Sequence, residues 1–167
     1  MTIDQKPAPA LAVTTPTDRE IQIERVFDGP RDRVFAVFTD PGLIPEWWGP
    51  RDTTTVVDQM DVRPGGSWRF VVHHTDGRET AFRGTYREVT PPERIVQTFE
   101  WEGMPGHVAV ETATFEDLGD RTRLTTTSLF HTVEERDGML ASGMETGAGE
   151  TYARLDEVLA RLGSARP

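Results

Sequence analysis

The sequence predicts an α+β fold in which a curved, seven-stranded antiparallel sheet wraps around one long C-terminal helix, with two short helices after the first strand. Three observations lead to this prediction. Segments with the period-2 alternation of strands follow one another from residue 53 to residue 130, with only short turns between them. The longest stretch with helical periodicity closes the chain. One helix is too narrow to cover a flat sheet, so we expect the sheet to curl around it.

Length and composition set the limits of the prediction. The chain has 167 residues, of which 36% are hydrophobic, which suits a single domain that we place at 18–163. Segments 1–17 and 164–167 are expected to be tails, and the first is expected to be disordered because it is rich in Pro, Ala and Thr. A net charge of −10 argues against nucleic acid or anionic lipid as a partner. No stretch reads as a membrane span or a secretion signal, so the expected location is the cytoplasm.

The first strand and the two short helices come from residues 18–50. Alternation in "DREIQIERVFDG" places Ile21, Ile23 and Arg25 on one face of a strand. Pro30 suits the first position of a helix, and apolar residues recur at helical spacing through "PRDRVFAVFTD". The segment "DPGLIPEWWGP" is long enough for one or two further turns before its Gly-Pro pair ends them.

Six further strands are predicted by alternation and by the turn residues that separate them. Their ranges are 53–62, 67–74, 80–89, 94–101, 108–118 and 121–130. The pairs Asp76-Gly77 and Gly119-Asp120 tolerate the positive φ of two-residue hairpin turns. Short links of this kind favour an antiparallel meander.

The closing segment, "MLASGMETGAGETYARLDEVLARLG", predicts the long helix. Its apolar stripe consists of Met144, Thr151, Leu155, Val158, Leu159 and Leu162. Three glycines, Gly143, Gly147 and Gly149, stand in the first half, where each costs about 1 kcal/mol relative to alanine. Two interpretations stay open. The glycines allow close approach of the sheet or leave room for a ligand, or they mark a kink or break between two helices.

Several motifs in order carry a resemblance to a known family. They include "IERVFDGPRDRVFAVFTDPGLIPEWWGP", "GGSWRFV", "TATFEDLGDRTRLTTT" and "GMETGAGETYARLDEVLARL". Over 18–162 the chain resembles a bacterial member of the START-like (SRPBCC, helix-grip) superfamily. More narrowly, it resembles the group named after the C-terminal domain of the activator of the 90-kDa heat-shock protein ATPase. The resemblance implies the helix-grip fold but leaves the function open, because this fold hosts lipid carriers, cyclases, hormone receptors and co-chaperone modules.

The aromatic residues are the candidate ligand-binding groups. Trp47 and Trp48 are neighbours, so on a helical turn they point about 100° apart, and we expect one ring in the core and the other at the mouth of a cavity. The sequence does not decide which. The predicted ligand-binding residues are Trp47, Trp48, Trp68, Phe70, Phe82, Tyr86, Phe99, Trp101, Met144 and Tyr152. The competing interpretation is that these aromatic faces are simply the core.

The polar residues do not assign a catalytic group. No G-x-S-x-G motif occurs, and the candidate acid or base residues are Glu46, Glu111, Glu150 and His131. A buried carboxylate would have a raised pKa and suit acid–base work, but the sequence does not show which one is buried. His73 and His74 are adjacent on a strand and face opposite sides, so no metal site is predicted. No cofactor is predicted either.

Three functions follow from these observations. The first is binding of a hydrophobic or aromatic small molecule in an internal cavity between the sheet and the C-terminal helix. The second is an enzyme of the polyketide cyclase, aromatase or hydrolase kind on the same scaffold, so whether the protein is an enzyme stays open. The third is a co-chaperone-like interaction module, although the resemblance extends only to the C-terminal domain of that activator, which argues against a chaperone partner. Exposed strand edges would also allow a homodimer.

Overall fold

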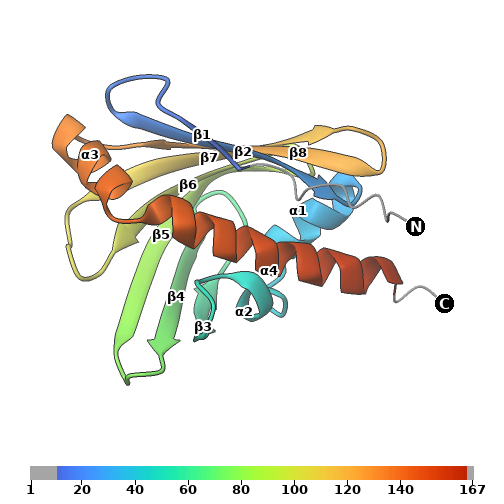
Figure 1. The fold of residues 1–167 in the computed structure, drawn as a ribbon, viewed down its shortest axis with the longest axis horizontal. Helices are drawn as coiled ribbons and strands as arrows, with labels where there is room; N and C mark the ends of the chain where they lie inside the picture. The colour runs from blue at the N-terminus through green and yellow to red at the C-terminus, as the bar shows by residue number, and fades with distance from the viewer. Residues whose placement is uncertain (1–10, 165–167) are drawn as a thin grey trace, which may run out of the picture.

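An eight-stranded antiparallel sheet curves around the C-terminal helix in the computed structural model, which describes residues 11–164 (Figure 1). The strand order is β1-β2-β8-β7-β6-β5-β4-β3. The strands are β1 (Ala12–Thr14), β2 (Glu20–Asp28), β3 (Thr53–Met60), β4 (Ser67–His74), β5 (Glu79–Thr90), β6 (Arg94–Trp101), β7 (Val108–Asp117) and β8 (Arg121–Leu129). The helices are α1 (Arg31–Thr39), α2 (Ile44–Trp47), α3 (Val133–Ala141) and α4 (Met144–Ser164). The predicted α+β architecture is confirmed.

The sheet has one strand more than the seven predicted. Ala12–Thr14 forms β1, which pairs with β2 through Val13 and Ile23, inside the segment expected to be a tail. Val13 packs on the small cluster around Ile21. The three residues of β1 have no strand pattern of their own, and they are ordered by this packing and by pairing with β2. Residues 1–10 and 165–167, also expected to be tails, lie outside the described residues.

The meander from β3 to β8 follows the predicted order, and β2 closes it by pairing with β8. Successive side chains alternate between the two faces of the sheet, and the concave face carries the core residues. The largest side chains of this core include Phe27, Trp68, Phe115 and Leu124.

Helix α4 crosses the concave face, with α1 and α2 beside its C-terminal half (Figure 1). Its buried residues are Tyr152, just before the middle of the helix, and Leu155, Val158 and Leu159 in the C-terminal half. The buried Arg25 on β2 donates to the Tyr152 carbonyl at 3.0 Å and forms an ion pair with Asp156. These contacts attach the second half of α4 to the sheet.

The closing segment forms two helices rather than one. α3 ends at Ala141 and α4 begins at Met144. Gly143 between them has a φ of +84°, a backbone conformation that residues other than glycine rarely adopt. The break interpretation is therefore correct for Gly143. α3 begins with a capping box in which Thr132 and Glu135 satisfy each other's backbone N–H groups. Within the described chain no helix is both long and apolar enough to cross a membrane.

Candidate functional site

The two adjacent tryptophans take different positions, as expected from helical geometry. The Trp47 ring is 3% exposed, donates from Nε1 to the Val37 carbonyl at 3.1 Å, and packs on Phe38. Trp48 ends α2 in an extended conformation, and its half-buried ring faces the sheet. Trp47 therefore anchors α2 in the core, whereas Trp48 covers the concave face.

Trp48 is the centre of an aromatic cluster. Its ring centroid lies 5.1 Å from that of Phe70, 5.3 Å from that of Phe82 and 6.5 Å from that of Trp68. Phe82 in turn stacks on Phe99 at 5.2 Å. Trp68 and Phe70 are buried, but Trp48, Phe82 and Phe99 keep part of their surface accessible although they face inward. The structure thus brings together five of the predicted aromatic residues. We call Trp48, Trp68, Phe70, Phe82 and Phe99 the Trp48 cluster.

Trp68 reaches across a neighbouring strand. Its Nε1 donates to the Thr98 carbonyl on β6 at 3.2 Å, although β5 lies between β4 and β6. The crossing occurs at Gly84, where an added Cβ would stand 2.6 Å from the Trp68 nitrogen and 2.0 Å from the Thr98 oxygen. Only glycine leaves room for this contact.

A row of polar side chains runs across four strands on the same concave face. The strand registers pair Tyr86 with Gln97, Gln97 with Glu111, and Glu111 with Ser128. Directly opposite residues lie about 5 Å apart, so the four side chains form a continuous line from β5 to β8. We call these four residues the polar row.

Glu111 is the carboxyl group of the polar row. Burial raises its pKa from 4.5 to about 7, and the hydrogen bond from the Ser128 hydroxyl at 3.3 Å lowers it only in part. Even so, the residue keeps some accessible surface. A carboxyl group with a raised pKa that still has accessible surface can exchange a proton or pair with a ligand.

Helix α4 is thinnest above the polar row. Met144 packs on the cluster of Ile21, Ala109 and Phe130, and the Tyr152 hydroxyl lies 3.5 Å from the Thr126 hydroxyl. The polar row lies between these two contacts in the strand register, and the position midway between Met144 and Tyr152 on the same helix face is Ala148, with Gly147 and Gly149 on either side. The two lengths agree: the eight residues from Met144 to Tyr152 rise about 12 Å along the helix, and the four residues from Ala109 to Ala113, the strand partner of Thr126, span about 13 Å along β7. A Cβ added at Gly147 would meet no atom within 4 Å.

The remaining predicted ligand-binding residues take up different places. Tyr86 belongs to the polar row and is buried, which raises its pKa. Tyr152 is also buried with a raised pKa, and it packs edge-on against Phe27. Met144 bounds the row at the α3 end. Trp101 is 43% exposed at the end of β6, where its ring lies close to Gly103, and it has no ring contact with another aromatic residue of the described chain.

Three of the four candidate acid or base residues lie outside this site. Glu46 forms an ion pair with Arg161, and Glu150 accepts a hydrogen bond from the backbone of Arg51. His131 is exposed. Within residues 11–164 no three His, Asp or Glu side chains are grouped as metal ligands.

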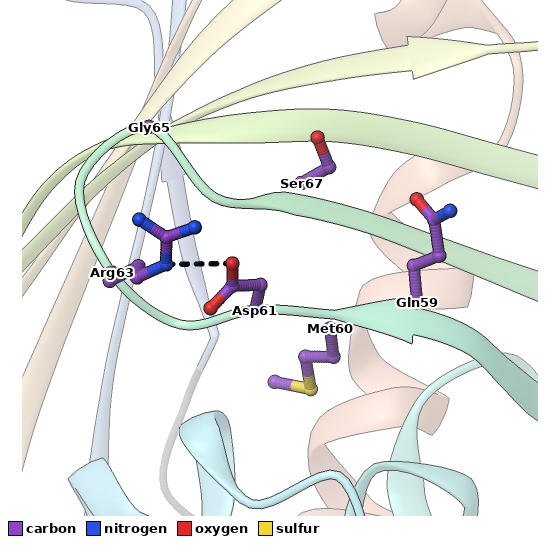
Figure 2. A pocket seen from close by; sticks show the side chains of 6 residues that line it. All are labelled: Gln59, Met60, Asp61, Arg63, Gly65 and Ser67. Atoms are coloured by element: carbon purple, nitrogen blue, oxygen red, sulfur yellow. Dashed lines mark hydrogen bonds and ion pairs between the residues drawn. The ribbon is translucent and has the colours of Figure 1, made fainter.

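Two shallow hollows occur elsewhere on the surface. One, of about 460 Å³, lies at the turn between β3 and β4, where Figure 2 shows Arg63 paired with Asp61 beside Ser67 and Gln59. The other, of about 490 Å³, is lined mainly by convex-face residues of β4 to β6, including the pairs Arg69–Glu102 and Arg83–Glu100. Neither hollow lies between the sheet and α4, and the charged groups in both are already paired with each other.

Of the four residues of the polar row, Gln97 is the one that sequence reasoning did not single out as a polar contact for a ligand. Alternation places Gln97 on the same face of its strand as Phe99, among apolar residues. A polar residue that interrupts the apolar face of a strand is the signal that was available. The alignment of Gln97, Glu111 and Ser128 was not available, because it depends on the pairing of three strands.

Comparisons with known proteins agree with the fold. A crystal structure from Rhodobacter sphaeroides is 25% identical with a TM-score of 0.84, covering 92% of this chain and 99% of that one. An NMR structure from Arthrobacter aurescens is 25% identical with a TM-score of 0.82, covering 90% and 91%. The AHSA1 protein from Silicibacter pomeroyi, at 23% identity and a TM-score of 0.71, covers 84% and 97% and is similar in fold.

No curated protein sequence matches the chain. The family model described as "Activator of Hsp90 ATPase homolog 1-like protein" matches residues 28–160, which run from the end of β2 into α4 and include the whole polar row and the Trp48 cluster. With most of the domain matched and the helix-grip architecture in place, the chain belongs to the family of activator of Hsp90 ATPase homolog 1-like proteins.

Proposed function

We propose that the protein binds a hydrophobic or aromatic small molecule between the concave face of the sheet and the first half of α4. One observation carries the proposal. The polar row lies beside the Trp48 cluster on an inward face, and Gln97, Glu111, Phe82 and Phe99 all keep accessible surface there. Apolar walls with a few convergent polar groups are typical of small-molecule sites.

The shape of α4 supports the same conclusion. A larger side chain at Gly147 would cost nothing in contacts, since a Cβ there meets open space, and alanine would stabilise the helix. The turn of α4 over the polar row therefore carries three small residues in succession, Gly147, Ala148 and Gly149, and this supports room for a ligand beneath it.

Nile red fluorescence tests the proposal, because this uncharged dye emits strongly in apolar sites. We expect saturable binding to the wild type, and about tenfold weaker binding to Trp48→Ala, which removes an accessible ring of the cluster. Trp101→Ala is the matched control, since it removes the same side chain at the exposed end of β6. Equal affinities of the wild type and Trp48→Ala would refute the site.

A second function, acid–base catalysis on the bound molecule, is favoured by Glu111. A pKa of about 7 suits a group that exchanges a proton at neutral pH. This candidate includes the cyclase, aromatase and hydrolase reactions. Native mass spectrometry of the protein incubated with cell extract would compare the wild type with Glu111→Gln. A retained ligand of the same mass in both proteins would argue for binding without chemistry.

The interaction-module hypothesis stays a prediction. The family description refers to an activator of the Hsp90 ATPase, and an ATPase assay with that chaperone is the direct measurement. Stimulation of ATP hydrolysis by the wild type would support this third function. Comparison with Trp48→Ala would then show whether the stimulation depends on the concave site.

A further inference from the structure

The charges around the polar row indicate which class of molecule it binds, and this inference rests on the proposed function. We propose that the ligand is a hydrophobic or aromatic amine whose ammonium group pairs with Glu111. The Glu111 carboxylate lies on the concave face of the sheet, and the aromatic rings of Trp48, Phe82 and Phe99 lie on the same face beside it.

Glu111 has a hydrogen bond but no ion pair. Within the described chain the Glu111 carboxylate accepts one side-chain hydrogen bond, from the Ser128 hydroxyl, whereas a carboxylate can accept about four hydrogen bonds. The neighbouring Gln97 amide has no hydrogen-bond partner among the described residues. Two polar groups therefore face the site with unused capacity.

The buried cation nearest to the polar row is already engaged. Arg25 pairs with Asp156, donates to the Tyr152 carbonyl, and lies 4.8 Å above the Phe27 ring. It is the only arginine or lysine that is buried within residues 11–164. An anionic ligand would meet the Glu111 carboxylate without a free cation beside it, so fatty acids and phosphate compounds are disfavoured.

An ammonium group fits the remaining features. Phe99 lies two residues from Gln97 on the same face of β6, and Gln97 is the direct strand partner of Glu111. A ligand whose ammonium group pairs with the Glu111 carboxylate can therefore contact the Phe99 ring. Ring faces attract cations as well as apolar groups. The formal charge of −10 also favours the approach of cations over anions.

Release of a proton on binding distinguishes an ion pair between a ligand ammonium group and Glu111 from binding by apolar contacts alone. The titratable group that interacts with Glu111 is Tyr152 on α4, and the other titratable or charged groups on the elements packed around the site are Tyr86 on β5, Asp156 on α4 and Arg25 on β2. Burial raises the pKa of both tyrosines, which keeps them neutral, and Arg25 and Asp156 pair with each other. Glu111 is the member of this group that titrates near neutral pH. A bound cation holds Glu111 ionised, so binding displaces its proton to the solvent.

The experiment uses three compounds with one ring system: 2-(2-naphthyl)ethylamine, the uncharged 2-(2-naphthyl)ethanol and the anion 2-naphthylacetate. Each competes with Nile red for the wild type and for Glu111→Gln, and calorimetry in buffers of different ionisation enthalpy counts released protons. We expect the amine to bind about tenfold more tightly than the alcohol at about pH 8, and the acid to bind most weakly. The affinity of the amine should fall about tenfold between about pH 8 and about pH 6, as Glu111 takes up its proton.

Glu111→Gln should bind the amine and the alcohol equally and release no proton. Equal affinities in the wild type, a preference that survives in Glu111→Gln, or failure of all three compounds to displace Nile red would each overturn the ammonium pairing. In those cases Nile red binding that depends on Trp48 leaves the proposed function standing. If Nile red itself does not bind the wild type, the proposed function fails and the pairing fails with it.

Discussion

Glu111 on β7 and Ser128 on β8 are direct partners in the strand pairing, and the Ser128 hydroxyl donates to the Glu111 carboxylate at 3.3 Å. This one long hydrogen bond does not compensate for burial, and the pKa of Glu111 rises to about 7. The contact therefore leaves a carboxyl group that the folded protein holds in its protonated form at mildly acidic pH.

The first prediction concerns stability against pH. Between about pH 4.5 and about pH 7 the folded state retains a proton on Glu111 that the unfolded state has lost, so the contribution of Glu111 to the free energy of unfolding falls as the pH rises. Glu111→Gln removes this fall. The variant should be more stable than the wild type by up to about 3 kcal/mol at about pH 8 and should lose this advantage towards about pH 5.

Urea denaturation at a series of pH values measures the difference between the two proteins. Glu145→Gln is the matched control, because Glu145 is exposed on α4. A difference between Glu111→Gln and the wild type that does not change with pH would contradict the burial of the carboxyl group.

The second prediction separates the two adjacent tryptophans. Trp47→Ala removes a buried ring and its hydrogen bond to the Val37 carbonyl, and should lower the free energy of unfolding by about 3–5 kcal/mol. Trp48→Ala removes a half-buried ring and should cost only about 1–2 kcal/mol. Chemical denaturation checks both values. Equal losses would mean that both rings serve the core in the same way.

The third prediction compares two glycines. Gly147→Ala should raise the free energy of unfolding by up to about 1 kcal/mol, because the added Cβ meets open space within a helix. Gly84→Ala should destabilise the protein strongly, because the Cβ would fall 2.0 Å from the Thr98 oxygen. The indole N–H signal of Trp68 in NMR spectra should shift in Gly84→Ala and stay in place in Gly147→Ala. A tolerated Gly84→Ala would contradict the close crossing.

The fourth prediction concerns Arg25 and Asp156. The Arg25 side chain is 6% exposed and the Asp156 side chain 39%, and burial raises the pKa of Asp156 more than Arg25 lowers it. Asp156→Ala removes the carboxylate beside a buried cation and should cost about 2 kcal/mol, less than a fully buried pair because Asp156 reaches solvent. The double variant Arg25→Met, Asp156→Ala should be more stable than Asp156→Ala, because it no longer leaves a buried cation without its carboxylate. Thermal unfolding of both proteins, with Arg25→Met alone as the reference, provides the test, and additive losses would contradict the coupling.

The features that the sequence predicted well are those written in local patterns. Alternation in "GSWRFVV" placed Trp68 and Phe70 on one face, and the stripe through Leu155 and Leu159 placed α4 on the sheet. β1 was missed because its three residues gain their order from β2. α3 was missed although Thr132 and Glu135 form a capping box, a signal that was present in "HTVEE".

The sequence by itself determined the fold class, the inward faces of the strands and the division of Trp47 and Trp48 between two directions, because these follow from periods of 2.0 and 3.6 residues. Only the tertiary structure decided that Trp48 faces the sheet and that Glu111, rather than Glu46 or Glu150, lies deep. Burial and pKa depend on which strands are paired and on what the helix above them carries. Residues 97, 111 and 128 meet through strand register, a long-range property that no local pattern contains.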